Sequence, residues 1–184
     1  SANASVSGSD GEDVFIPIRD DDDAIKLAFA KERADDRKKW LMAYDKNKTL
    51  RNDQKIIPYY DFVHYDLIHF SNEDLNRSIP SVIDGFKPSQ RKILYGAFLR
   101  GLDKDEVKVA QLAGFVSDKA AYHHGEASLM GAIIGLAQDF VGSNNINILE
   151  PLGQFGGRSM GGKDAASPRY IFTKIPTISS MIFK

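Results

Sequence analysis

The stretch that decides the fold is residues 107–141, VKVAQLAGFVSDKAAYHHGEASLMGAIIGLAQDFV. Its apolar residues recur at helical spacing on both sides of a short glycine-containing break. We expect a first helix over 107–121, a turn over 122–125 and a second helix over 126–141. Two helices joined by a short turn of this kind are typical of a helix-turn-helix, a motif found in many DNA-binding proteins.

The sequence changes character after this motif. Residues 147–149 and 169–175 have the composition of short strands. Between them, residues 153–167 contain five glycines and are too polar and too glycine-rich for regular structure. A helix-turn-helix followed by two strands and a flexible loop makes a winged helix. We therefore predict a mostly helical α+β fold of this kind.

The N-terminal half predicts helices separated by polar segments. We expect helices over 22–45, 59–70 and 89–99, a polar linker over 46–58 and a turn-rich passage over 71–80. Residues 1–21 lack an apolar signal core, and the first of them are small and polar. We expect this segment to be disordered or in part a remnant of cloning.

Composition sets broad limits on function. The chain has 184 residues, of which 42% are hydrophobic and 27% charged, a balance that allows one domain or one domain with an appendage. A net charge of −1 gives no sign of a polyanionic partner. There are no cysteines, which excludes disulfides and cysteine-type zinc sites. No apolar run reaches the roughly 20 residues that a membrane span needs.

Charge is unevenly distributed along the chain. Residues 9–23 are strongly acidic, whereas residues 77–100 contain five basic side chains and one acid, Asp84. The basic side chains are Arg77, Lys87, Arg91, Lys92 and Arg100. On the residues alone they could form a solvated basic face or a set of phosphate contacts.

Tyr170 follows Arg169 in the segment KDAASPRYIFTKI, residues 163–175. An unperturbed phenol has a pKa of about 10 and is a poor nucleophile at neutral pH unless nearby groups stabilise the phenolate. Arg169 is the local candidate for that role, although successive side chains in a strand point to opposite faces. The pair is therefore open to two interpretations, a structural tyrosine or a nucleophile that attacks phosphate.

Three other motifs could in principle form ligand sites. His123 and His124 belong to a set of four histidines without a zinc-binding spacing, so they indicate either a hydrogen-bonded helix start or a phosphate contact. Gly161-Gly162-Lys163 does not complete a Walker motif, because Asp164 follows the lysine. We expect that loop to cross a DNA backbone instead. The acidic run Asp20–Asp23 is interpreted as hydrated surface, and we place no metal ligand in the chain.

Four segments occur in an order that resembles the DNA-gate region of type IIA DNA topoisomerases, on the eukaryotic topoisomerase II branch. They are RSIPSVIDGFKPSQRKILY (77–95), KVAQLAGFVSDKAAYHHGEASL (108–129), NNINILEPLGQFGGR (144–158) and GGKDAASPRYIFT (161–173). The resemblance implies a winged-helix DNA-cleavage domain over 59–184, truncated at its C-terminal side. It also implies that residues 22–58 are the end of the metal-binding TOPRIM region and a linker.

The resemblance assigns roles to residues of this chain. Tyr170 is expected to attack a DNA phosphodiester and form a 5′-phosphotyrosyl link, with Arg169 stabilising the transition state and His124 contacting the phosphate. DNA-binding roles are expected for Arg77, Lys87, Arg91, His123 and Lys163. In the full-length family, two subunits cut double-stranded DNA and pass a second duplex through the break.

The resemblance also implies partners that this chain does not hold alone. Mg²⁺ and ATP are expected to bind in other parts of the full-length enzyme, which works as a nuclear homodimer, with organellar and viral settings left open. Topoisomerase II poisons are expected at the cleavage site, and no membrane is involved. The fragment alone is expected not to relax supercoils. The alternatives are a winged-helix DNA-binding module without chemistry and a structural interaction domain, for which we expect no salt-dependent DNA affinity.

Overall fold

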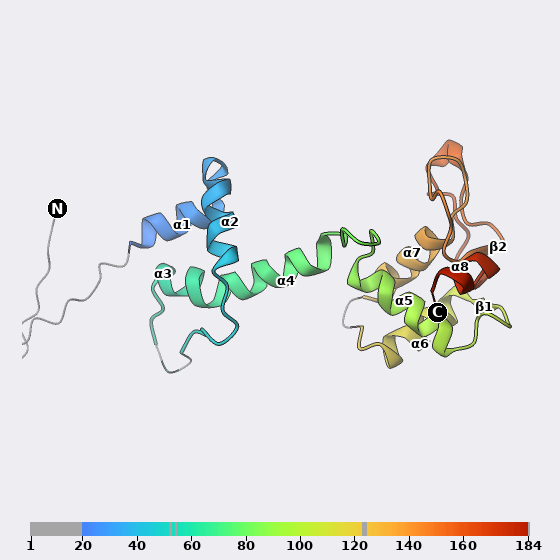
Figure 1. Ribbon diagram of the computed structural model, residues 1–184, viewed down its shortest axis with the longest axis horizontal. Helices are drawn as coiled ribbons and strands as arrows, with labels where there is room; N and C mark the ends of the chain where they lie inside the picture. Colours follow the sequence, from blue (N-terminus) through green and yellow to red (C-terminus); the bar gives the residue numbers. More distant parts are fainter. Residues whose placement is uncertain (1–19, 52, 54, 123–124, 184) are drawn as a thin grey trace, which may run out of the picture. The chain divides into compact units, whose positions relative to one another are not determined.

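Residues 20–51, 53, 55–122 and 125–183 are described by the computed structural model. The chain divides into two compact units, the first ending at Leu75 and the second beginning at Asn76 (Figure 1). The mostly helical α+β fold expected from the sequence is confirmed, with a small antiparallel sheet in the second unit. Most of the segment expected to be disordered lies outside the described residues, as do His123 and His124.

The described part of the first unit is helical. Its elements are α1 (Asp21–Phe29), η1 (Lys31–Arg33), α2 (Ala34–Met42), α3 (Tyr59–Phe62), η2 (Val63–Leu67) and α4 (Ile68–Ser78), the last of which continues past Leu75. Residues 59–75, which the sequence pattern grouped with the second domain, belong to this unit. One reason is that the backbone N–H of Tyr60 donates to the Asp21 carboxylate at 2.8 Å, which ties α3 to α1.

The single helix expected over 22–45 is divided in two. Ala30 is extended, with a ψ of 131°, and a 3-10 turn precedes α2. The Arg37 guanidinium donates to the carbonyls of Leu27 and Ala30 at 3.0 and 2.6 Å. Helix ends leave such carbonyls without partners inside the helix, so Arg37 stabilises the break.

The helix expected over 59–70 is present and runs further than predicted. It passes through α3, the π-helical turn η2 and α4, and ends at Ser78. The prediction of turns over 71–80 was therefore wrong for residues 71–78. Ser71 fits the helix because its hydroxyl donates to the Leu67 carbonyl four residues earlier, at 2.9 Å.

Two histidines tie this long helix to α2 and to the segment that follows α2. The indole N–H of Trp40 donates to Nδ1 of His64 at 3.2 Å. The hydroxyl of Tyr44 lies 3.0 Å from Nδ1 of His69, whose Nε2 donates to the Lys48 carbonyl at 2.8 Å. Burial lowers the pKa of His64, although Asp23 and Asp61 oppose the shift. The His64 imidazole is therefore held as a neutral ring with the proton on Nε2.

The second unit contains four helices, a 3-10 turn and three short strands among its described residues. They are α5 (Pro88–Leu99), β1 (Val107–Lys108), α6 (Val109–Lys119), α7 (Glu126–Ala137), β2 (Glu150–Leu152), η3 (Arg158–Met160), β3 (Phe172–Lys174) and α8 (Thr177–Ile182). The two predicted helices around the 122–125 turn are present, but each is shorter than expected. Helix α7 ends at Ala137 because Gln138 is extended, with a ψ of 133°.

The sheet has the strand order β1-β3-β2, and both pairs are antiparallel. Val107 and Pro151 pair with Thr173 from opposite sides. The expectation that residues 107 and 108 are helical was wrong, because β3 offers Val107 a strand partner that no local pattern reveals. The strands expected at 147–149 and 169–175 are found at 150–152 and 172–174.

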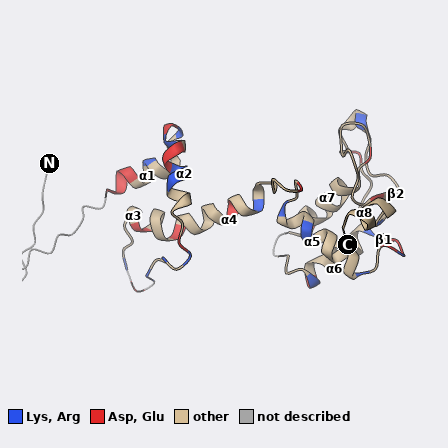
Figure 2. Cartoon of the chain, viewed as in Figure 1, with Lys and Arg blue, Asp and Glu red and all other residues tan. Residues whose placement is uncertain are grey.

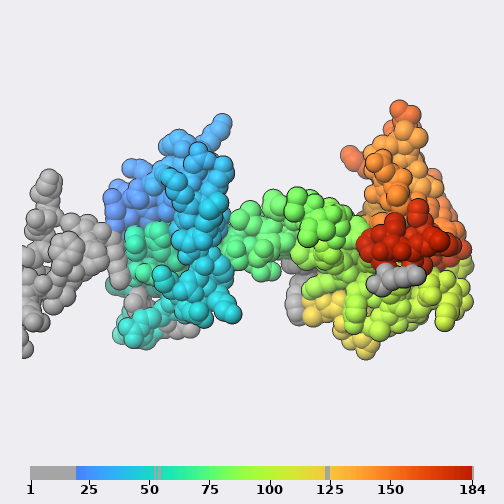
Figure 3. Space-filling view, in the orientation of Figure 1, coloured from blue at the N-terminus to red at the C-terminus, as the bar shows by residue number. Residues whose placement is uncertain are grey.

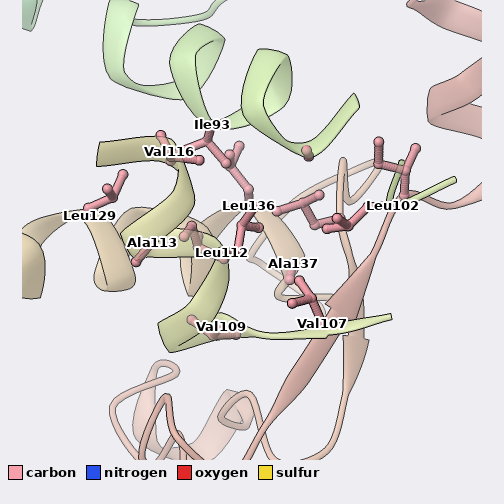
Figure 4. Packing of buried hydrophobic residues seen from close by; sticks show 14 of the residues in the cluster. Ile93, Leu102, Val107, Val109, Leu112, Ala113, Val116, Leu129, Leu136 and Ala137 are labelled. Carbon is pink, nitrogen blue, oxygen red and sulfur yellow. The ribbon is translucent and has the colours of Figure 1, made fainter. Parts of the chain in front are cut away.

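The core of the second unit lies between α5, α6, α7 and the sheet (Figure 4). Its fully buried members include Ile93, Leu112, Val116, Leu129, Ile133, Leu149 and Ile171. Each side chain of this size contributes about 1.5–3 kcal/mol when it is removed from water. The helix spacing recognised in the sequence therefore corresponds to the buried faces of the three helices.

Candidate functional site

Tyr170 lies at the end of a tight turn that precedes β3. Its backbone N–H donates to the Ser167 carbonyl at 2.9 Å. The turn is fixed to the start of α6, since Ala110 N–H donates to Pro168 O and Val109 N–H donates to Ile171 O, each at 3.0 Å. The Tyr170 side chain is 71% exposed. A rigid backbone thus presents an accessible phenol, which differs from a tyrosine packed in a core.

Arg169 is brought together with Tyr170. The guanidinium carbon lies 5.7 Å from the centroid of the phenol ring, within cation–π range. Both residues are exposed, and both lie in the turn before β3 begins at Phe172. The alternation of side chains along a strand therefore does not separate them. A cation held beside an exposed phenol can stabilise negative charge that develops on the phenol or on a group it attacks.

Arg91 and Lys87 lie at the N-terminal end of α5. Lys87 is the N-cap residue, and its backbone N–H donates to the Gln90 side chain at 2.9 Å. Arg91 pairs with Asp84 at 2.6 Å, with its guanidinium 6.0 Å from the Phe86 ring centroid. The N-terminal end of a helix carries partial positive charge, which adds to that of the two cations.

Asp84 is a neighbour of this basic end whose role the sequence pattern did not reveal. The Phe86 backbone N–H donates to its carboxylate at 3.0 Å, and Arg91 donates to it at 2.6 Å. The Phe86 hydrogen bond, and after it Arg91, lowers the pKa of Asp84, although desolvation opposes the shift. Asp84 thus stays ionised and partly neutralises Arg91. Its position as the one acid in the basic stretch was the signal in the sequence.

Arg77 is exposed and lies on the last turn of α4. In Figure 2, basic residues gather at the end of α4 and at the start of α5, whereas acidic residues gather on α1 and α2. The local basic surface predicted for residues 77–100 is therefore built mainly at the entry to α5. His123 and His124, predicted to contact DNA phosphate, lie outside the described residues.

The segment 153–167 is called the glycine loop below, and it projects from the rest of the second unit (Figure 3). It has one 3-10 turn, η3, and is otherwise irregular, as expected. Lys163 is exposed on this loop. Asp164, which breaks the Walker pattern, accepts a hydrogen bond from the Gly157 N–H at 2.9 Å. The acid therefore shapes the loop.

Two residues important to the local geometry were missed. Lys92, on α5, donates through Nζ to the Ala121 carbonyl at 2.8 Å, and Ala121 has a left-handed φ of 45°. Gln138 bonds to the glycine loop from the end of α7. Neither has a local signal in the sequence, because each acts on a segment far along the chain.

The structure gives the acidic run a helix-capping role. The Asp20 carboxylate accepts from the Asp23 N–H at 3.0 Å, and Asp23 pairs with Arg33. Among the residues that the structure describes, no group of three or more His, Cys, Asp or Glu side chains is placed to hold a metal ion. In the same residues, no helix is long and apolar enough to cross a membrane.

Comparison with known proteins gives a match for each unit. Residues 77–184 match the family described as DNA gyrase/topoisomerase IV. The chain belongs to the type IIA DNA topoisomerases. Residues 12–75 match the C-terminal associated domain of TOPRIM, so the two matches meet where the two compact units meet.

Relatives of known identity place the chain within these topoisomerases. Human DNA topoisomerase 2-beta is 54% identical over 176 residues, which cover 89% of this chain and 11% of the human protein. DNA topoisomerase 2 of Acanthamoeba polyphaga mimivirus is 50% identical over 173 residues, covering 93% of this chain and 14% of the viral protein. The chain therefore spans a small part of the topoisomerases it matches.

A solved structure supports the same placement. The crystal structure of the Plasmodium falciparum topoisomerase II DNA-binding, cleavage and re-ligation domain matches with a TM-score of 0.74 and 53% identity. The match covers 86% of this chain and 22% of that one. The resemblance to type IIA DNA topoisomerases noted in the sequence is confirmed.

Proposed function

We propose that this chain forms the DNA-gate part of a eukaryotic-type DNA topoisomerase II and carries its nucleophile, Tyr170. The observation that carries the proposal is the exposed phenol on a backbone-anchored turn, with the Arg169 guanidinium beside it. In a chain about half identical to known topoisomerase II enzymes, these features favour transesterification over a structural tyrosine.

The proposed reaction exchanges one phosphodiester for another. The Tyr170 oxygen attacks a backbone phosphorus as the phenol loses its proton, and the bond from phosphorus to the 3′ oxygen breaks. The 3′ oxygen takes up a proton, and a 5′-phosphotyrosyl link remains. Arg169 stabilises charge that develops on the phosphate. Reversal of the same steps reseals the strand without a further energy source.

A winged helix is the finer fold that we propose for the second unit. Helices α6 and α7 would be the helix-turn-helix, and the antiparallel pair of β2 and β3 with the glycine loop would be the wing. The first unit would be the end of the TOPRIM region with its linker. In this arrangement Tyr170 follows the wing directly, at the point where the chain returns to α6.

DNA contact is proposed for Arg77, Lys87, Arg91, His123 and Lys163, with His124 near the scissile phosphate. Support comes from the exposed positions of Arg77, Arg91 and Lys163, and from the position of Lys87 at the helix N-terminus. Each phosphate contact adds about 0.9 to the salt dependence of duplex binding. A structural interaction domain would lack that salt dependence.

Cofactors and assembly belong to the full-length enzyme in this proposal. The described residues offer no donor set that fits Mg²⁺, so no step is routed through a metal. Mg²⁺ and ATP are assigned to segments outside this chain. A homodimer acts on double-stranded DNA in the nucleus, and poisons bind at the cut. The fragment alone should not relax supercoils, and measurable relaxation by the purified chain would contradict this.

The proposal is tested in the full-length enzyme with a suicide DNA substrate that traps the covalent intermediate. Tyr170→Phe should abolish the protein–DNA adduct while duplex affinity stays within about twofold. Tyr59→Phe, at another exposed tyrosine, is the matched control and should form adduct normally. Adduct in the Tyr170→Phe enzyme, or none in the unaltered enzyme, would favour a DNA-binding module without chemistry.

A further inference from the structure

Gln138 connects the end of α7 to two separate points of the glycine loop. Its Nε2 donates to the Phe155 carbonyl at 2.9 Å and to the Gly162 carbonyl at 3.2 Å. A carboxamide nitrogen has two hydrogens, so both donors are used. Gln138 is the first residue beyond α7, which gives its side chain a fixed origin on the helical core.

The space around this amide is too tight for larger residues. A Cβ at Gly162 would lie 2.3 Å from Nε2 of Gln138, and a Cβ at Gly156 would lie 2.5 Å from the Gly162 carbonyl. Both glycines have left-handed φ angles, of 78° and 96°. The glycine content of the loop therefore serves a close approach to Gln138.

Asn144 fixes Gln138 in turn. Its Nδ2 donates to the Gly135 carbonyl at 2.7 Å and to the Gln138 carbonyl at 2.8 Å. Those acceptors lie in the last turn of α7 and just beyond it, where helix carbonyls have no partner inside the helix. A continuous chain of bonds thus runs from α7 through Asn144 and Gln138 to the loop.

The loop held in this way carries exposed cations and leads into the catalytic turn. Arg158 and Lys163 are exposed on it. The Ala166 N–H donates to the Gln154 carbonyl at 2.9 Å, which closes the base of the loop just before Pro168. The conformation that Gln138 imposes therefore reaches the residues before Arg169 and Tyr170.

We infer that Gln138, supported by Asn144, is a positioning residue for DNA binding and cleavage. It holds the glycine loop so that Lys163 meets the DNA backbone in a fixed place. The inference rests on the proposed DNA-binding function. A role confined to stability would leave the energetic coupling between Gln138 and Lys163 at zero, because separate contributions to binding add.

The test uses full-length enzyme with Gln138→Met, which keeps the length of the side chain and removes its donors. Trypsin cleavage after Arg158 and Lys163 should rise at least fivefold, since the loop loses both bonds. Duplex affinity should fall about three- to tenfold, and its salt dependence should decrease by about one contact. Lys163→Ala should weaken binding clearly in the unaltered enzyme and by less than twofold in the Gln138→Met enzyme.

A second pair of variants guards against general unfolding. Asn144→Ala should reproduce the loop cleavage in weaker form, whereas Asn145→Ala, at the adjacent exposed residue, should not. Unchanged loop cleavage in Gln138→Met and Asn144→Ala, or a full effect of Lys163→Ala in the Gln138→Met background, would overturn the inference. Failure of the proposed function would appear separately, as an adduct that survives Tyr170→Phe.

Discussion

Arg91 and Asp84 form an ion pair at the entry to α5, with 2.6 Å between guanidinium nitrogen and carboxylate oxygen. The pair places an acid beside a residue proposed to bind DNA phosphate. Half of the Arg91 side chain stays exposed, at 50%. Asp84 therefore competes with DNA for Arg91 and limits the strength of that contact.

Removing the charge of Asp84 should tighten DNA binding. Asp84→Asn keeps an oxygen for the Phe86 N–H and releases Arg91, so duplex affinity should rise about two- to fivefold at low salt and less at high salt. Fluorescence anisotropy over a salt series measures this change. Asp105→Asn, at another exposed acid of the same unit, should have a smaller effect. An equal or weaker effect at Asp84 would show that Arg91 does not contact DNA.

Arg169 should act on the chemical step and contribute little to binding. Arg169→Ala should slow single-turnover cleavage by about 100-fold, a typical cost of losing one group that stabilises transition-state charge. The dissociation constant for duplex DNA should change less than about threefold. Lys104→Ala, an exposed cation in the loop after α5, is the control and should cleave normally. A large loss of affinity with an unchanged cleavage rate would assign Arg169 to binding instead.

His64 should make the stability of the first unit sensitive to mild acid. Burial lowers the pKa of His64 in the folded state, so the unfolded state binds more protons. The contribution of the neutral ring is complete above the unfolded pKa of about 6.5 and is lost as pH falls below it. The denaturant midpoint should therefore decrease between about pH 7.5 and about pH 5.5.

A matched variant isolates this effect. His64→Gln keeps an acceptor for the Trp40 indole and cannot titrate in this range, so its midpoint should depend less on pH. Equilibrium unfolding followed by Trp40 fluorescence is suitable, because Trp40 is the one tryptophan of the chain. Equal pH dependence in both proteins would show that other groups control acid sensitivity.

The contact between α5 and α6 predicts opposite effects for two glycine substitutions. A Cβ at Gly96 would lie 2.6 Å from Cγ2 of Val116, so Gly96→Ala should destabilise the second unit by about 1–3 kcal/mol. Gly114 has open space on α6, and Gly114→Ala should stabilise by about 0.5–1 kcal/mol. Denaturant unfolding compares the two. Val116→Ala combined with Gly96→Ala should recover part of the loss.

Much of the fold was predictable because it depends on local patterns. The buried faces of α5, α6 and α7 follow apolar spacing, and Ile93, Leu112 and Ile133 all lie in the core. Strand β1 was not predictable from its own residues, since Val107 becomes a strand residue through pairing with Thr173 far along the chain. The helical run after Phe70 was also missed, because polar residues hid its continuity with α4.

The site was predictable where chemistry lies in adjacent residues. Tyr170 and Arg169 are neighbours in the sequence, and their exposed positions agree with the expected role. Their backbone conformation depends on bonds from Val109 and Ala110, which no local pattern contains. Gln138 was missed for the same reason, because its partners lie 17 and 24 residues later.

The most direct test of the central claim is to map the covalent adduct by mass spectrometry. Full-length enzyme is trapped on a suicide substrate, and nuclease and trypsin then reduce the adduct to a nucleotide-bearing peptide. The mass should lie on YIFTK (170–174) or DAASPRYIFTK (164–174), each of which contains Tyr170 as its single tyrosine. Fragmentation that places the nucleotide on any other residue, or unmodified Tyr170 peptide from a fully trapped enzyme, would contradict the account.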